Sequence, residues 1–172
     1  MLENEQTTLL DKIIGFILDI GLSIKKAEFH HKSFLPGITV EEGVIVINER
    51  ALLYPGDLLH EAGHLAVIAP ERRTHTQDNV GNQAAEEMMA IAWSYAASVH
   101  LKLDPSVVFH EDGYRGDSAS LIEAFTSGRT FGVPMLQWIG LTAEEKRAKE
   151  IGVEPYPAMI KWVLDKAPAQ YT

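Results

Sequence analysis

A chain of 172 residues, 46% hydrophobic and 23% charged, has the length and composition of one globular domain with a sizeable core, so we expect residues 1–172 to form a single domain. The net charge of −9 disfavours nucleic acid or an anionic membrane surface as a partner. Because the sequence contains no cysteine, disulfides, thiolate metal sites and cysteine nucleophiles are excluded, and any metal must be bound by histidine and carboxylate side chains.

An amphipathic helix is predicted near the N-terminal end of the chain. Leu9, Leu10, Ile13, Ile17 and Ile20 recur at helical spacing, which predicts a helix over about residues 7–20. The polar start of the chain is unlike the basic region of a signal peptide, and the apolar stretch that follows is too short to cross a membrane. We therefore expect a cytoplasmic protein without a membrane span.

The strongest strand prediction covers residues 43–48. At its centre is Val-Ile-Val-Ile, a β-branched run bounded by Gly43 and Asn48. The other strongly patterned segments favour helices. The sequence therefore predicts an α+β fold that is mainly helical, with one small sheet that includes residues 44–47.

Residues 57–67 are predicted to form a buried helix, because apolar side chains occupy most of its surface. The preceding Pro55-Gly56 indicates a helix start, with Asp57 as the N-cap. Pro70 is expected to end the helix.

This helix carries the sequence His-Glu-x-x-His at positions 60–64. His60 and His64 are one turn apart on one side, so both imidazoles can bind one Zn²⁺ at roughly 2.0–2.1 Å. Glu61 is displaced by about 100° around the helix axis. It is therefore placed to reach a water in an open coordination position, where a general base is needed.

The second half of the chain is read as further helices joined by loops. Residues 71–82 are polar and are expected to form a loop, and the Ala-rich residues 83–101 a long buried helix. Residues 107–110 form a strand or a helical turn, and 111–117 a loop. Three more helices are predicted: residues 118–126, a helix to Glu150 opened by a capping box at Thr142–Glu145, and a short apolar helix over residues 159–164.

A catalytic zinc site needs a third protein ligand. Glu86 and Glu87 are the acidic residues of the second buried helix, and we favour Glu87, with Glu86 as the alternative. Glu87 shares a helical stripe with small residues. This stripe forms either a solvated face or a face that packs closely against the helix of His60 and His64. The other candidate ligands are His75, Asp78, His100 and His110.

The motif and its apolar helix resemble those of the zincin metallopeptidases. A glutamate on a downstream helix is similar to the gluzincin branch, which implies Zn²⁺ bound by His60, His64 and Glu87, with Glu61 as the base that activates the zinc-bound water. In zincins an edge strand beside this helix pairs with an extended substrate. The resemblance thus implies a zinc metallopeptidase acting on a peptide or protein, with residues 43–48 near the substrate.

Two features bear on whether such a site is catalytic. Gluzincins often have an acidic residue after the ligand glutamate that orients a histidine, but Ala90 and Ile91 stand there in this chain. His110, Tyr114 and Arg115 are candidates for stabilising a transition state. The alternative is a non-catalytic zincin-like metal-binding module with a regulatory or partner-binding role.

Overall fold

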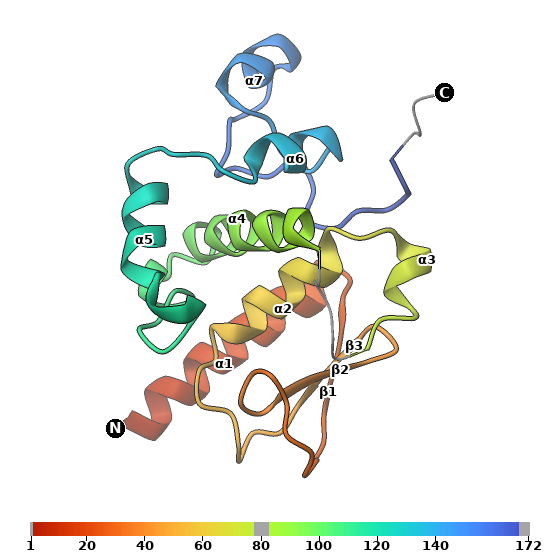
Figure 1. Ribbon diagram of the computed structural model, residues 1–172, viewed down its shortest axis with the longest axis vertical. Helices are drawn as coiled ribbons and strands as arrows, with labels where there is room; N and C mark the ends of the chain where they lie inside the picture. The colour runs from red at the N-terminus through yellow and green to blue at the C-terminus, as the bar shows by residue number, and fades with distance from the viewer. Residues whose placement is uncertain (1, 78–82, 169–172) are drawn as a thin grey trace.

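The computed structural model describes residues 2–77 and 83–168, with side chains described from Thr8 onward. Within these residues the chain forms seven α-helices, two short 3₁₀ turns and one three-stranded sheet, which confirms the α+β prediction. The sheet lies toward one end of the molecule and α6 and α7 toward the other, with α2 and α4 between them (Figure 1).

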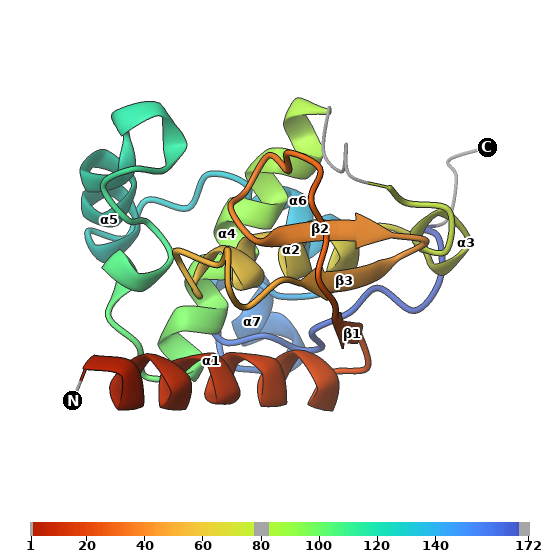
Figure 2. The same ribbon diagram turned by 90° about the horizontal axis from the view of Figure 1, so that it is seen from below.

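The N-terminal helix α1 (Leu2–Asp19) begins earlier than predicted, but its amphipathic character is confirmed. Ile13 and Ile17 are fully buried, whereas Asp11 and Lys12 are exposed. The apolar face of α1 packs against α2 and β1. Figure 2 shows the helix running along one side of the molecule.

The sheet consists of β1 (Ser23–Lys26), β2 (Ile38–Glu41) and β3 (Val44–Ile47) in the order β1-β3-β2. β3 pairs in parallel with β1 and antiparallel with β2. The predicted strand is confirmed, but it is central. The implied edge position next to a substrate is therefore wrong for these residues, because both sides of β3 already have partner strands.

The motif helix α2 (Asp57–Ala66) lies between the sheet and α4 (Ala84–His100). Its N-cap is Gly56, so the prediction of Asp57 as the N-cap is wrong; the Asp57 carboxylate bonds His110 instead. Pro70 does not end α2 either. The helix stops at Ala66, and Pro70 opens the short helix α3 (Pro70–Arg73), within a stretch predicted to be a loop.

The predicted long second helix is confirmed as α4, and the prediction for residues 118–126 is confirmed as α5 (Ser118–Thr126). The 3₁₀ turns η1 (Pro105–Val107) and η2 (Tyr114–Gly116) lie between them. α6 (Val133–Trp138) packs against α4.

Two predictions near the C-terminal end are wrong. α7 (Glu145–Ile151) forms, but its N-cap is Glu144 and the hydroxyl of Thr142 donates to the Ala158 carbonyl, so no capping box exists. Residues 159–164 are not helical. Their backbone bonds go to distant segments, as when the Leu164 N–H donates to Ala66 O at 2.8 Å, and the apolar side chains pack without a helix.

Candidate metal centre

His60 and His64 project from one face of α2 toward α4, as their spacing predicted. Their Nε2 atoms are 3.0 Å apart and their rings are perpendicular, with centroids separated by 4.6 Å. Both residues are buried, at 8% and 2% exposure. The helix therefore brings two ring nitrogens to one point in the interface between α2 and α4.

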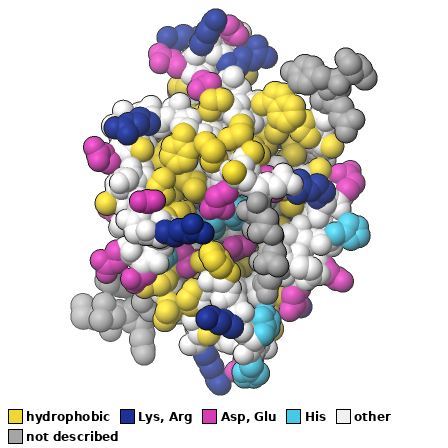
Figure 3. All heavy atoms as spheres, viewed as in Figure 1, with side chains coloured by type: hydrophobic (Ala, Val, Ile, Leu, Met, Phe, Trp, Pro, Cys, Tyr) yellow, Lys and Arg dark blue, Asp and Glu magenta, His cyan; other side chains and the backbone are white. Residues whose placement is uncertain are grey.

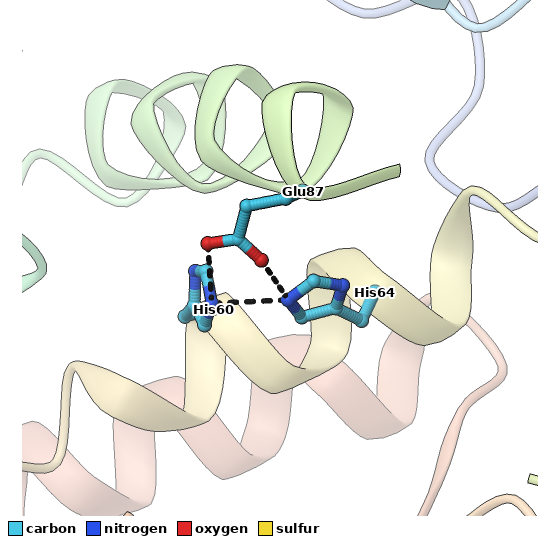
Figure 4. Close-up of side chains that lie close together, drawn as sticks. All are labelled: His60, His64 and Glu87. Carbon is cyan, nitrogen blue, oxygen red and sulfur yellow. Dashed lines mark hydrogen bonds and ion pairs between the residues drawn. The ribbon is translucent and has the colours of Figure 1, made fainter. Parts of the chain in front are cut away.

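Glu87 reaches the same point from the first turn of α4. Its carboxylate oxygens lie 3.5 Å from His60 Nε2 and 2.8 Å from His64 Nε2. Figure 4 shows the carboxylate pointing from α4 at the two imidazoles on α2. These ligand atoms all lie within 4.8 Å of one another. Because tetrahedral zinc ligands at 2.0–2.1 Å are about 3.3 Å apart, small adjustments allow the group to hold a metal ion.

Glu86 points elsewhere. Its side chain is buried and forms an ion pair with Arg72 of the neighbouring helix α3, at 2.6 Å. The structure therefore brings Glu87, and not Glu86, to the two histidines. The carboxylate of Glu86 instead links the start of α4 to α3 through Arg72.

Of the remaining candidate ligands, the three that the structure describes do not join the group. His75 is exposed after α3, and Asp78 lies outside the described residues. His100 packs its ring against Phe16 and Trp162. His110 Nε2 lies 2.7 Å from Asp57 Oδ1.

The electrostatics favour an uncharged imidazole beside an ionised carboxylate. Burial lowers the pKa of His60 to about 4, and nearby His64 adds to this effect while Glu87 opposes it. Burial on its own would raise the pKa of Glu87, but the hydrogen bond with His64 and the electrostatic interaction with both histidines outweigh it, so the pKa is lowered. At neutral pH the centre thus offers the forms of His60 and Glu87 that a metal ion requires.

Glu61 differs from the other residues of α2, all of which the structure describes. The other nine are buried, whereas Glu61 is only partly buried. In the view of Figure 3, histidine and acidic side chains lie near the middle of the face, where α2 and α4 pack together in Figure 1. Glu61 is therefore the residue of α2 whose side chain is partly accessible, whereas both histidines are buried.

The three candidates for transition-state stabilisation are placed differently. Arg115 is exposed on η2. His110 is held by Asp57 and stacks on Tyr54, with ring centroids 3.7 Å apart. The hydroxyl of Tyr114 contacts His60 Nδ1 at 3.0 Å, a role that the sequence did not reveal because no spacing pattern links this loop to α2.

The close approach of α2 and α4 depends on small residues. Ala90, Ser94 and Ser98, which share the stripe of Glu87, are fully buried, so this stripe packs against other parts of the protein and is not solvated. On α2 the partner is Gly63, where an added Cβ would meet Ala90 O at 2.9 Å. The sequence indicated this contact. A glycine inside a helix costs stability relative to alanine, so its presence there indicates close packing against a neighbouring element.

Comparisons with protein-family models, curated proteins and solved structures find no match to the chain. No helix among the described residues is long and apolar enough to cross a membrane. The residues of the site itself therefore carry the functional inference.

Proposed function

We propose that the protein is a zinc-dependent hydrolase of the metallopeptidase type, with His60, His64 and Glu87 as metal ligands and Glu61 as general base. The observation that carries the proposal is the convergence of two imidazole Nε2 atoms and one carboxylate within 4.8 Å, beside a glutamate in the His-Glu-x-x-His sequence. Two imidazoles and a carboxylate are a ligand set of catalytic zinc sites, which keep a further position open. The resemblance to zincins supports the same reading.

The ligand chemistry favours zinc over harder cations. Ca²⁺ and Mg²⁺ prefer oxygen ligands, whereas two of the three ligand atoms here are imidazole nitrogens. A bound zinc ion would polarise a substrate carbonyl and lower the pKa of water toward about 7.

Residues of the chain would supply the proton transfer, the orientation of the ligands and the metal binding. Glu61, which is only partly buried, would take the proton from the attacking water and deliver it to the leaving nitrogen of a peptide or protein substrate. Burial between α2 and α4 fixes the orientation of His60 and His64. The carboxylate of Glu87 would hold the metal from α4.

The test combines metal analysis with the Glu61→Gln variant. Purified protein is expected to carry about one zinc per chain. With zinc retained, Glu61→Gln should lower hydrolysis of a defined peptide library by about 10²–10⁴-fold, the usual contribution of a general base. The exposed Glu123 on α5 provides a matched Glu→Gln control that should change neither quantity.

The other outcomes are equally informative. Protein that binds no zinc would contradict the proposal. Zinc retained without hydrolysis of any library peptide would favour the alternative, a non-catalytic metal-binding module with a regulatory or partner-binding role.

A further inference from the structure

Tyr114 contacts the edge of His60 that faces away from Glu87. Its hydroxyl lies 3.0 Å from His60 Nδ1, whereas the other ring nitrogen, Nε2, lies 3.5 Å from Glu87 Oε1. The two nitrogens occupy different edges of the imidazole. The Tyr114 hydroxyl therefore lies at the edge away from Nε2, the nitrogen that would bind the metal. This position suits a residue that orients His60, and not one that contacts a substrate.

We infer that Tyr114 is a positioning residue of the metal centre, whose hydroxyl oxygen accepts the Nδ1–H of His60 and keeps the Nε2 lone pair directed toward Glu87. The inference rests on the proposed metal site. A neutral histidine that binds a metal through Nε2 carries its proton on Nδ1, and this proton needs an acceptor. Tyr114 supplies that acceptor in a chain that lacks the acidic residue expected for this purpose.

The two motif histidines differ in this respect. Nδ1 of His64 is buried and has no hydrogen-bond partner among the described residues. His60 Nδ1 faces the Tyr114 hydroxyl. The orienting contact is therefore specific to the first histidine of the motif.

The surroundings of Tyr114 hold its ring in place. The ring meets His60 edge to face, at a centroid distance of 5.4 Å and 88°, and packs on the buried Phe109 at 5.2 Å. The Ser118 hydroxyl donates to His110 O at 2.5 Å, which ties the start of the loop to α5.

The backbone of Tyr114 supports the same role. Tyr114 and the following Arg115 both have φ of 54°, in the left-handed region that residues other than glycine rarely adopt. Such conformations cost free energy and persist where the surrounding contacts demand them. Here they turn the Tyr114 ring from a surface loop toward His60.

The experiment compares wild type with Tyr114→Phe, which keeps the ring and removes the hydroxyl. Zinc affinity is measured by competition with a chromophoric chelator, and the tautomer of His60 is read from its ring ¹⁵N chemical shifts in metal-free protein. We expect zinc to bind about 10–100-fold more weakly, as for other residues that support metal ligands. We also expect His60 to be in the Nδ1–H form in wild type and to lose that preference in the variant.

Tyr156→Phe is the matched control. The Tyr156 hydroxyl donates to the Ala92 carbonyl of α4 at 2.7 Å and does not contact the centre. Its loss should lower stability while zinc affinity and the His60 tautomer stay as in wild type. Equal weakening of zinc binding by both variants would mean that α4 is merely loosened, and it would overturn the positioning role.

The two proposals fail in different ways. Wild-type protein that binds no zinc contradicts the proposed function, while the His60 tautomer in metal-free protein still tests Tyr114. A wild-type His60 in the Nε2–H form, or a tautomer unchanged in Tyr114→Phe, overturns the inference even if zinc binds. The first of these two results comes from the wild-type spectrum alone, so it does not depend on whether the variant folds.

Discussion

Gly63 of α2 packs directly against Ala90 of α4, one helical turn after Glu87. A Cβ on Gly63 would lie 2.9 Å from the Ala90 carbonyl oxygen, 3.3 Å from its Cα and 3.2 Å from the Trp93 ring. Two of these three atoms belong to backbone and cannot rotate away. The separation of the two helices, and with it the distance from Glu87 to the histidines, therefore depends on a glycine inside the motif.

Replacing Gly63 with alanine should force α2 and α4 apart. We expect the free energy of unfolding to fall by about 1–3 kcal/mol, as for other overpacked cores, and zinc affinity to fall because His60 and His64 move away from Glu87. Urea unfolding of metal-free protein and chelator competition measure the two effects.

Gly15→Ala is the matched control. Gly15 lies inside α1, and an added Cβ there would meet nothing within 4 Å. This substitution should stabilise the protein by about 0.5–1 kcal/mol and leave zinc binding unchanged. If Gly63→Ala behaves like Gly15→Ala, the close approach of the helices does not constrain the centre.

Glu86 and Glu87 should respond differently to the same substitution. Glu87→Gln removes a charged oxygen from the group and should weaken zinc binding by more than the roughly 10–100-fold caused by losing a supporting residue. Glu86→Gln should keep the zinc and lower stability by up to about 1 kcal/mol, because the more than half-exposed Arg72 loses its charged partner. Metal content and urea unfolding of both variants separate these effects; zinc lost only from Glu86→Gln would assign the ligands the other way.

The parts of the site that lie on long helices could be predicted from the sequence. His60 and His64 are related by the helical period alone, and the small residues after Glu87 continue its stripe along α4. These relationships need no knowledge of the rest of the fold. The confirmed elements α1, α4 and α5 were found in the same way.

Features that depend on distant partners could not be predicted. β1 is four residues long and includes Lys25 and Lys26, whose charges are paired with Glu41 and Glu49, so its sequence shows no apolar alternation. The apolar residues 159–164 resemble a helix, but Trp162 O accepts from Trp93 Nε1 of α4. In both cases tertiary contacts, and not local pattern, determine the backbone.

Arg73 is expected to be important for the end of α2. Its guanidinium donates to Leu65 O at 2.8 Å, Ile68 O at 3.0 Å and Leu164 O at 2.8 Å. Arg73→Ala removes these donors from three carbonyls and should destabilise the protein by on the order of 3 kcal/mol. Urea unfolding tests this against Arg147→Ala, whose exposed pair with Glu150 should contribute less than about 1 kcal/mol.

The stability of metal-free protein should depend on pH through His60. The pKa of His60 is about 4 in the folded protein, against an ordinary value of 6.5. Between these values the unfolded chain binds more protons than the folded one, so the free energy of unfolding falls as the pH is lowered.

From about pH 7 to about pH 5 this difference should remove about 2 kcal/mol of stability. The lowered pKa of Glu87 acts in the same direction but only nearer its ordinary value of 4.5, so Glu87 contributes little over this range. His60→Gln removes the titrating group and should flatten the curve, whereas replacing the exposed His30 with glutamine should leave it unchanged. Urea unfolding at both pH values, with a chelator present, measures the slopes. Equal slopes for wild type and His60→Gln would show that burial does not keep this imidazole neutral in the folded protein.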